Sequence, residues 1–536
     1  TGLSGQALAQ TAPDAGQTLQ QLVPPPALPQ ESKPMLIQLP APATPGVPGG
    51  PQVELRAVTF KGNTVYSEDE LKALLGESLG KRYDLAGLRA LAEQVSAHYR
   101  VRGYPFARAF IPPQEFSGSL HIEVLEGRYG AVQALGDADL VTGAQPFLAA
   151  LKSADLIESS ALERTMLLLQ DQPGVKVVPT IKPGQQVGSG DLMVGLDRES
   201  RFGGEVGVDN AGNRYTGQNR ARATLYANSP FLFGDRVTLN TLVTNESLWL
   251  GSLDYELPVG GSGLRAQFGY AHTSYSLGRE FENLMATGLA RVSTGKLSYP
   301  IVRSQLTNVQ ISAAYQHKLL QDNYGSTGTS EEKSSRSWPL AMRFDHRDRV
   351  GGGGISYGAL TWTGGRLSLD NALAVADAST AKKEGNFSKL NVDVARIQKL
   401  PGEYSLYGRY SGQWADKNLD SSERFGLGGN YGVRAYPLGE GMGDRGALVQ
   451  VELRYDAGVV APYVLYDAGQ VRVNHTAWDE ASAARRFLSG YGVGMRANYQ
   501  GWNMDLALAW RINGGVPQAD VKTQDLRALL QLNYRF

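Results

Sequence analysis

The sequence predicts a transmembrane β-barrel of sixteen antiparallel strands, preceded by an N-terminal helix, a Pro-rich linker and two small α/β modules. Three observations indicate this fold class. The 536 residues include 64 Gly, 25 Tyr and 7 Trp, a mixture that is unusual for a soluble enzyme. No run of about 18 apolar residues occurs, which excludes a conventional transmembrane helix. Residues 199–536 instead alternate apolar and polar residues, as the strands of a membrane barrel do.

The charge balance and the missing cysteine narrow the functional classes. The chain has no Cys, which excludes a disulfide framework, a thiolate zinc site and a cysteine nucleophile. Its 52 basic and 52 acidic residues cancel, so bulk charge gives no reason to expect nucleic acid as a partner.

The N-terminal region carries information on localisation. Ala7-Leu8-Ala9 resembles the end of a secretory signal peptide, so residues 1–9 are interpreted as a leader remnant; a disordered polar N-terminus is the alternative. Residues 10–23 contain a weakly amphipathic helix candidate that ends at Pro24. Residues 24–52 are rich in proline and cannot pack a core, so we expect an extended spacer that tethers the helix.

Residues 53–129 predict the first small module, with the element order β-α-α-β-β. Ser67-x-x-Glu70 is a capping box, which begins a first helix. Asp84 caps a second helix, and Gly103 stops it. The predicted strands cover residues 53–60, 106–111 and 120–125.

Residues 130–198 repeat the same unit in a more degenerate form. A second capping box, Ser160-x-x-Glu163, begins a helix over residues 161–170. Repetition of one small unit indicates docking modules in series, and each small sheet leaves an edge strand that could accept an extended peptide. The other predicted elements are strands at residues 132–135, 175–181 and 191–196 and a helix near residues 146–151.

Residues 199–536 contain sixteen stretches, each of about ten residues, with a period of two. The alternation is cleanest in the last two, where Trp502 and Ile512 share an apolar face and Asp505 and Arg511 lie on the other. A soluble β-sandwich has the same period, but its apolar face meets a second sheet. The sixteen cores lie at residues 201–210, 219–228, 234–245, 248–258, 264–274, 286–299, 307–320, 335–347, 353–366, 386–400, 403–415, 446–456, 460–470, 488–499, 502–512 and 527–536.

The connections between these strands favour a membrane barrel, because their lengths alternate. Short turns on one rim and long loops on the other are typical of an outer-membrane barrel. An even number of strands then places both the modules and the C-terminus on the short-turn, periplasmic side. The long connections are predicted at residues 211–218, 275–285, 321–334, 367–385, 416–445, 471–487 and 513–526, with the short link 246–247 as the exception.

No enzyme motif stands in a suitable context. Gly76-Glu77-Ser78-Leu79-Gly80 matches the nucleophile pattern G-x-S-x-G, but it follows a helix instead of joining a strand to a helix. The 6 His are scattered without ligand spacing. The charged stretch 345–349 lies at a strand end and is interpreted as a solvated rim. We therefore expect no catalytic residue, no metal site and no cofactor.

The strongest candidate for function is the long connection 416–445. It carries Gly428-Gly429-Asn430-Tyr431-Gly432-Val433-Arg434-Ala435-Tyr436, so it is rich in glycine and places an arginine among apolar and aromatic residues. This composition favours a loop that folds back into the lumen, since glycine permits close backbone approach. On a later strand, alternation turns Asp467 to the lumen together with Leu465.

An ion pair between Arg434 and Asp467 would then hold the loop tip to the barrel wall. In a wet lumen such a pair contributes about 0.5–1 kcal/mol, and more where neighbouring groups exclude water. Two unrelated lumen charges are the alternative.

These features together resemble the POTRA–barrel superfamily, and specifically the two-partner secretion transporters. That family has a Val-Arg-Gly-Tyr tetrad at the tip of its sixth loop, which Val433-Arg434-Ala435-Tyr436 resembles with Ala in place of Gly. Its wall motif Phe-x-Asp-x-Gly falls on Leu465, Asp467 and Gly469. Val101-Arg102-Gly103-Tyr104 spells the tetrad in full, but it lies where a module helix ends and is assigned a structural role.

The resemblance covers essentially the whole chain. It implies a barrel in the lipid of a Gram-negative outer membrane, two POTRA modules in the periplasm and an N-terminal helix that plugs the pore. The implied partner is one large unfolded exoprotein with an N-terminal secretion domain, such as an adhesin, a haemolysin, a haem-capturing protein or a contact-dependent toxin. Without a nucleotide site, partner folding outside the cell would drive export.

Tyr534 and Phe536 would form the C-terminal signal that periplasmic chaperones and the barrel-assembly machinery read. Two other functions stay open, a factor that assembles other outer-membrane barrels and a passive porin. Two modules and a Pro-linked plug count against the first, and a porin does not need tandem periplasmic modules.

Overall fold

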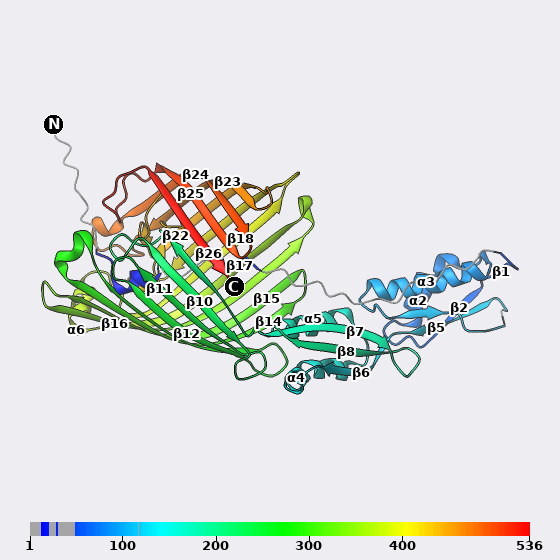
Figure 1. The fold of residues 1–536 in the computed structure, drawn as a ribbon. Coiled ribbons are helices and arrows are strands. Elements are labelled where there is room, and N and C mark those ends of the chain that lie inside the picture. The colour runs from blue at the N-terminus through cyan, green and yellow to red at the C-terminus, as the bar shows by residue number, and fades with distance from the viewer. Residues whose placement is uncertain (1–11, 21–27, 30–48, 116) are drawn as a thin grey trace.

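The computed structural model describes residues 12–20, 28–29, 49–115 and 117–536. A β-barrel forms one end of the molecule, and two small α/β modules extend in a row from one mouth of it (Figure 1). Residues 1–9, interpreted above as a leader remnant, lie outside the described residues, as does most of the Pro-rich linker. None of the described helices is both long and apolar enough to cross a membrane.

The barrel consists of sixteen antiparallel strands that pair in the order of the sequence, as predicted. The last strand closes the sheet on the first, from Gln531 opposite Asp209 to Arg535 opposite Glu205. Closure pairs the strand edges, which a sheet within a lipid bilayer requires. The strands are β9 Phe202–Asp209, β10 Arg220–Asn228, β11 Arg236–Thr244, β12 Trp249–Pro258, β13 Arg265–Ser276, β14 Ala286–Arg303, β15 Thr307–Tyr324, β16 Thr329–Asp348, β17 Gly354–Leu369, β18 Gly385–Lys399, β19 Tyr404–Ala415, β22 Arg445–Tyr455, β23 Val460–Arg472, β24 Arg485–Tyr499, β25 Trp502–Asn513 and β26 Leu526–Arg535.

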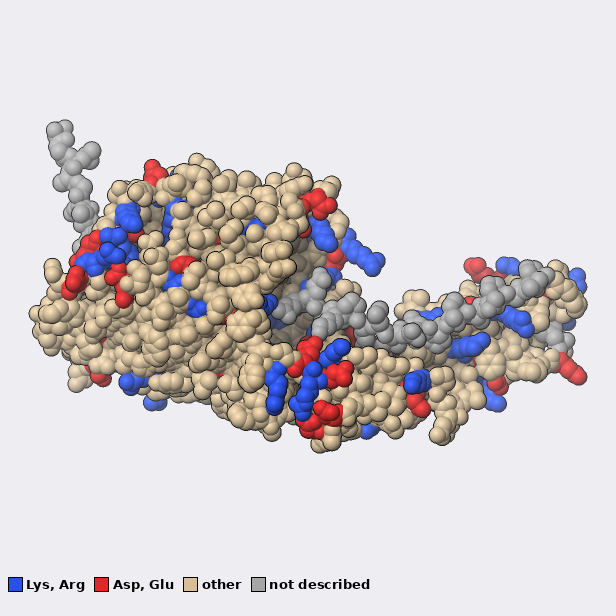
Figure 2. All heavy atoms as spheres, in the orientation of Figure 1, with Lys and Arg blue, Asp and Glu red and all other residues tan. Residues whose placement is uncertain are grey.

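Each strand turns one face to the lumen and the other outward, as the period of two predicts. On β25, Trp502 and Ile512 are 48% and 50% exposed, whereas Ala507 and Ala509 are 4% and 0% exposed. Figure 2 shows a mostly uncharged wall along the barrel in that view. An outer-membrane barrel presents such an apolar band to lipid.

The prediction of a long loop at residues 321–334 is wrong. β15 continues to Tyr324 and β16 begins at Thr329, so only residues 325–328 connect them. Alternation of apolar and polar residues fails as a signal here because the buried inner face of this hairpin carries the polar side chains of Asp322 and Lys333. Four of the other long connections contain short helices, η2 Arg279–Leu284, α6 Asn371–Ser379, η4 Ser421–Glu423 and η5 Ala481–Ala483.

The first module is a three-stranded sheet packed against two helices. The central strand β5 lies between the parallel β2 and the antiparallel β4. The capping box is confirmed at the start of α2, where hydrogen bonds from Ser67 hold the pKa of Glu70 below its usual value. Asp84 caps α3 by accepting from the Gly87 N–H at 2.8 Å, and Gly103 follows that helix with φ +98°. The elements are β1 Val53–Glu54, β2 Ala57–Lys61, α2 Glu68–Leu74, η1 Gly76–Ser78, β3 Arg82–Tyr83, α3 Leu85–Val101, β4 Arg108–Phe110 and β5 Ser119–Leu125.

The second module repeats this topology, with β8 between the parallel β6 and the antiparallel β7. The predicted capping box of Ser160 and Glu163 is wrong. α5 begins at Ser159, the Ser160 hydroxyl bonds the Glu158 carboxylate, and Glu163 accepts instead from the Gln305 N–H of a barrel turn at 2.7 Å. Glu163 is therefore committed to the contact with the barrel. The elements are β6 Arg128–Leu135, α4 Ala138–Ala154, α5 Ser159–Gln170, β7 Val175–Pro183 and β8 Ser189–Arg198.

The second module is joined to the short turns of the barrel. Asp171, at the end of α5, forms a two-point ion pair with Arg303, with both N–O distances at 2.7 Å. Phe147 of α4 packs beside Phe233 of another turn, with ring centres 6.1 Å apart. This module therefore has a defined position beneath the barrel mouth.

Candidate functional site

The connection 416–445 folds back into the barrel lumen. It begins with the short helix η4 Ser421–Glu423 and then forms a narrow hairpin from β20 Phe425–Gly426 and β21 Met442–Gly443. The tip of the loop is buried, and both Val433 and Tyr436 are 0% exposed. An apolar cluster joins the tip to the wall strands β22 to β25 and consists of Leu427, Val433, Ala435, Tyr436, Leu448, Val471, Leu488 and Ala509.

Two predicted site glycines are required by the geometry of the tip. Gly429 has φ +103°, in the left-handed region that glycine favours. A Cβ on Gly428 would lie 2.1 Å from the Pro437 carbonyl oxygen, so a side chain does not fit there. These positions allow the tip to close tightly on itself.

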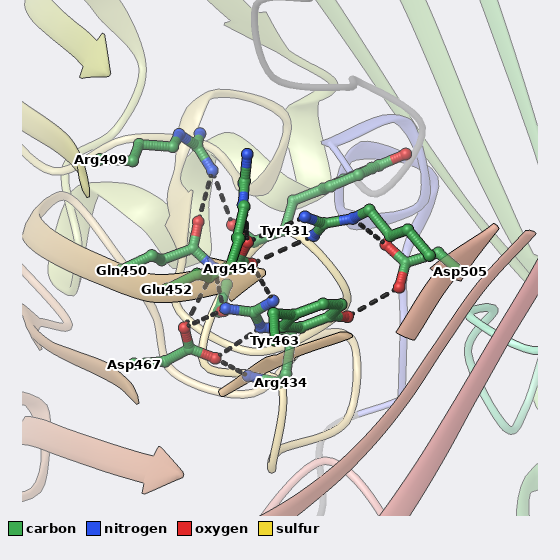
Figure 3. A network of polar contacts seen from close by, with 11 residues as sticks. Arg409, Tyr431, Arg434, Gln450, Glu452, Arg454, Tyr463, Asp467 and Asp505 are labelled. Carbon is green, nitrogen blue, oxygen red and sulfur yellow. Dashed lines mark hydrogen bonds and ion pairs between the residues drawn. The ribbon is translucent and has the colours of Figure 1, made fainter. Parts of the chain in front are cut away.

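Arg434 and Asp467 form the ion pair that the sequence predicts (Figure 3). The guanidinium Nε and Nη2 donate to the two carboxylate oxygens at 2.8 and 2.7 Å, and the Arg434 backbone N–H donates at 3.1 Å. Arg434 is 6% exposed and Asp467 is 0% exposed. Because the pair is buried, removing one partner is expected to cost about 3–5 kcal/mol, not the smaller value of a wet pair.

The pair belongs to a larger network of alternating charges that the sequence analysis missed. Glu452, which is 2% exposed, accepts from Arg434 and also from Arg496 at 3.0 Å. Arg496 continues to Asp505 at 2.9 Å and lies 4.3 Å from the centre of the Tyr463 ring. With a further bond from Arg454 to Glu452 at 2.8 Å, guanidinium groups and carboxylates balance in number: Arg434, Arg454 and Arg496 face Asp467, Glu452 and Asp505.

A sequence signal for these missed residues exists. Strand alternation places Glu452, Arg496 and Asp505 on lumen faces, as it does Asp467. Alternation does not give the register between strands, and it is the register that sets Arg496 directly opposite Asp505. The network as a whole could therefore be predicted only if the pairing of β24 with β25 were known.

The tip is also tied to the last connection of the barrel. The Tyr436 hydroxyl donates to the Asn513 carbonyl at 2.8 Å, and Arg527 of β26 donates to the Tyr436 carbonyl. Glu440, 0% exposed, accepts from Arg486 at 2.7 Å and from the backbone N–H groups of residues 518 and 519. The loop is thus held by its tip and by its returning limb.

Glycines in the barrel wall make space for the loop tip. A Cβ on Gly469 would lie 2.7 Å from Leu427 Cδ2, and a Cβ on Gly490 would lie 2.6 Å from the Ala435 Cβ. Ala435, which replaces the family's Gly, is therefore accommodated by a glycine of the wall. Leu465, the first residue of the predicted wall motif, packs instead in a separate cluster with Tyr463, Ala507 and Leu529.

The C-terminal aromatic residues lie on the closing strand, away from the loop. The Tyr534 ring is 4.9 Å from the Trp502 ring, and Phe536 is 56% exposed. The N–H and C=O of Phe536 both pair with Gly204 at 3.1 Å, which completes the seam between β26 and β9.

The described part of the predicted N-terminal helix, α1 Ala15–Gln20, lies in the lumen (Figure 1). Asp14 forms an ion pair with Lys333 of β16 at 2.9 Å and accepts from the Ser421 hydroxyl at 2.6 Å. The Ala15 N–H donates to Asp322 of β15 at 2.9 Å. The helix therefore contacts both the barrel wall and the start of the inward loop.

The motifs set aside in the sequence lie in ordinary structural positions. Gly76–Ser78 forms η1 between α2 and β3. Asp348, in the charged stretch at the end of β16, pairs with Arg396 at 2.8 Å. Within the described ranges, no group of three or more His, Asp or Glu is placed to hold a metal ion.

Two parts of the chain match known families. Residues 188–497 match the family described as haemolysin secretion/activation protein ShlB/FhaC/HecB, and residues 53–127 match the ShlB-type POTRA domain. The heme/hemopexin transporter protein HuxB of Haemophilus influenzae is 26% identical over 476 residues, which cover 86% of this chain and 83% of HuxB. The outer membrane transporter CdiB of Dickeya dadantii is 25% identical, over 87% of this chain and 84% of CdiB.

The fold is similar to that of a solved structure, CdiB from Escherichia coli. The TM-score is 0.71 at 20% sequence identity, and the match covers 92% of this chain and 93% of that one. The first family match spans more than half of the chain. The chain therefore belongs to the haemolysin secretion/activation protein ShlB/FhaC/HecB family of outer-membrane transporters, and its function is two-partner secretion.

Proposed function

We propose that the protein carries one large unfolded exoprotein, marked by an N-terminal secretion domain, from the periplasm to the cell surface. The observation that supports this most is the inward loop, which a buried Arg434–Asp467 pair holds inside a closed barrel above tandem modules. Relatives carry names for different cargoes, among them heme/hemopexin transporter and hemolysin transporter. An adhesin, a haemolysin, a haem-capturing protein or a contact-dependent toxin all fit this class.

Docking is proposed to occur by strand addition to a free edge of a module sheet. Two of the outer strands are poorly suited to it. The Ala109 N–H of β4 donates to the Ser96 hydroxyl of α3 at 2.9 Å, and β7 carries Pro179, which has no N–H. The remaining outer strands, β2 and β6, are the proposed docking edges.

The inward loop and α1 occupy the lumen, so transport requires both to rearrange. Folding of the exoprotein outside the cell would supply the driving force. Tyr534 and Phe536 are proposed to serve as the signal by which periplasmic chaperones and the barrel-assembly machinery insert the barrel.

Quantitative proteomics of surface, medium and periplasm tests this function in three strains: intact, deleted, and Arg434→Ala. Loss of one large protein from the outside in both altered strains is the expected result. A broad fall in many barrel proteins would indicate an assembly factor instead. An unchanged protein pattern would leave a pore for small solutes and contradict the proposal.

A further inference from the structure

We propose that the outer wall of strands β13 to β17 carries a binding site for the phosphate groups of an anionic outer-leaflet glycolipid. The site is a row of basic side chains across neighbouring strands, here called the basic row: His272, Arg291, His317, Arg336 and Arg366. It lies outside the barrel, away from the loop and the helix in the lumen.

Strand register places these residues in two groups, which are offset by two positions because Arg291 on β14 is the direct partner of Leu319 on β15. Arg336 of β16 is the direct partner of His317 on β15 and of Arg366 on β17. His272 of β13 is the direct partner of Arg291 on β14. Directly opposed residues have Cβ atoms about 5 Å apart, so the guanidinium and imidazole groups within each group can converge, and the two groups can bind two phosphates of one lipid.

Alternation turns the row outward. On β16, Lys333, Ser335 and Ser337 are buried, whereas Arg336 and Trp338 between and beyond them are exposed. Arg291 and Arg366 are exposed as well. Trp338 and Leu340, next along the same face, are 59% and 48% exposed and belong to the apolar band that meets lipid.

The depth of the row matches the lipid headgroups. Aromatic residues of a membrane barrel gather at the two interfaces. Tyr315 and Trp338 form such a pair, with ring centres 4.7 Å apart. His317 and Arg336 each lie two positions beyond these rings, away from the modules, which is about 7 Å at the usual rise per residue.

The arginines of the row lack a protein counter-charge. Among the described residues, Arg291, Arg336 and Arg366 have no ion pair or hydrogen bond, whereas the lumen arginines Arg434 and Arg496 are fully paired. Like charges directly opposite each other destabilise a sheet. Arginine binds phosphate through two parallel hydrogen bonds, so a phosphorylated lipid would supply the missing charge.

The surface above the row has room for a sugar headgroup. A groove of about 440 Å³ lies there, lined by Leu289, Arg291, Leu319, Glu332, Ser334 and Ser368 among others. Two carboxylates line this groove, Glu332 and Asp370. Asp370 caps α6, where it accepts from the Leu373 N–H at 2.9 Å. Glu332 is four positions from Arg336 on the same face, about 13 Å away along the strand. The occupant is taken to be lipid and not protein because this face continues into the membrane wall.

Lipid binding to the purified full-length protein tests the proposal. Bisphosphorylated lipid A is titrated into the protein in neutral detergent, and the apparent affinity is taken from the rise in unfolding temperature. The triple variant Arg291→Gln, Arg336→Gln, Arg366→Gln is expected to bind about tenfold more weakly or worse, since it loses several charge-assisted bonds. Dephosphorylated lipid A is expected to lose affinity for the wild type to a similar extent.

The matched control removes the same charge elsewhere, with Lys176→Gln and Lys182→Gln on β7 and Arg349→Gln in a short turn, and should bind as the wild type does. The shift in gel migration between heated and unheated samples reports whether each variant is folded. If the triple variant does not fold, the single variant Arg336→Gln is used in its place. Wild-type affinity in the row variant would overturn the proposal. So would equal binding of dephosphorylated lipid A, which means acyl-chain binding, or displacement of lipid A by equimolar inorganic phosphate, which means a free-phosphate site.

Discussion

At the scale of single residues, the burial of Arg434 determines what its removal does. Arg434→Ala leaves Asp467 buried without its cation, whereas Glu452 keeps Arg454 and Arg496. The change is expected to weaken loop docking by about 3 kcal/mol, a shift in occupancy of about a hundredfold. Exoprotein in the medium should fall accordingly, while the barrel is still found in the outer membrane. Immunoblots of both fractions measure this, with exposed Arg349→Ala as the control. Equal secretion by both variants would remove Arg434 from the mechanism.

The wall glycine Gly469 gives a second prediction at this scale. Gly469→Val places a side chain against Leu427 and is expected to destabilise the docked loop by about 1–3 kcal/mol through overpacking. Gly408→Val is the matched control, since a Cβ there meets no atom within 4 Å. Protease cleavage within residues 416–445, measured on purified protein, should increase only in the first variant. Equal protection of the two variants would show that the tip does not depend on close contact with the wall.

The sequence could predict the Arg434–Asp467 pair because alternation turns Asp467 to the lumen and the Gly-rich composition around Arg434 favours a loop that folds inward. It could not predict that Leu465 would pack away from the tip, or that Gly490 would compensate for Ala435. Those contacts join segments that lie far apart in the chain, and their partners depend on strand register. A period of two predicts the face on which a residue lies, but it does not predict which residue lies opposite it on the next strand.

At the scale of elements, α1 is held by an apolar cluster around Ala15 and by polar contacts, one of which is the ion pair of Asp14 with Lys333. Lys333 lies 2.9 Å from Asp14 and 3.6 Å from Asp420. Lys333→Ala leaves these carboxylates facing one another and should raise the fraction of open pores about tenfold. Conductance in planar bilayers measures this, and Gln17→Ala on the same helix is the control. A conductance like that of the control would mean that α1 is held by shape alone.

The docking edges of the modules can be mapped because the chain has no Cys. Single variants Thr59→Cys on β2, Gln133→Cys on β6 and Thr180→Cys on β7 are labelled with a photoreactive maleimide and mixed with the secretion domain of the exoprotein. Crosslinks are expected from β2 or from the part of β6 beyond Tyr129, whose N–H is bonded to the Asp155 carbonyl, and not from β7, which contains Pro179. Crosslinks from Thr180→Cys alone would contradict strand addition at the proposed edges.

Helices and strands could be predicted where the local sequence pattern alone determines them, and not where a tertiary contact competes with that pattern. All sixteen barrel strands follow from alternation, but the full length of the hairpin at 321–334 does not, since its inner face carries Asp322 and Lys333, which contact Ala15 and Asp14. The predicted capping box at Ser160 is wrong for a related reason, because Glu163 accepts a hydrogen bond from a barrel turn. In both cases a tertiary partner replaced the local one that the pattern implies.

At the scale of the whole molecule, the second module and the barrel share a joint at α5. Asp171 pairs with Arg303, and Arg164 donates to the Pro300 carbonyl at 2.7 Å. The Asp171 and Arg303 side chains are 42% and 14% exposed, so the pair should contribute about 1 kcal/mol. The double variant Asp171→Ala, Arg164→Ala is expected to widen the range of module positions without lowering the unfolding temperature of the barrel.

Spin labels on introduced cysteines, one at Lys176 in the module and one at Arg349 in a barrel turn, measure that range by double electron–electron resonance. Asp139→Ala is the control, because it removes an ion pair with Arg198 that lies within the module. A distance distribution as narrow as that of the control would show that apolar contacts such as Phe147 with Phe233 fix the joint. The order of modules and barrel follows from the sequence, whereas this joint rests on contacts that no local pattern encodes.

The position of α1 has a consequence for the order of events in time. The helix lies against η4, where a Cβ on Gly16 would come within 2.4 Å of the Ser421 hydroxyl, and Glu423 of η4 is held by Lys318 and Lys389 at 2.6 and 2.8 Å. The root of the loop is therefore enclosed between the helix and two lysines of the wall. A loop that withdrew first would have to pass its root through the space that the helix fills. If export requires both elements to leave the lumen, as proposed, we expect the helix to leave first, and the speed of its departure to limit how soon the loop can follow.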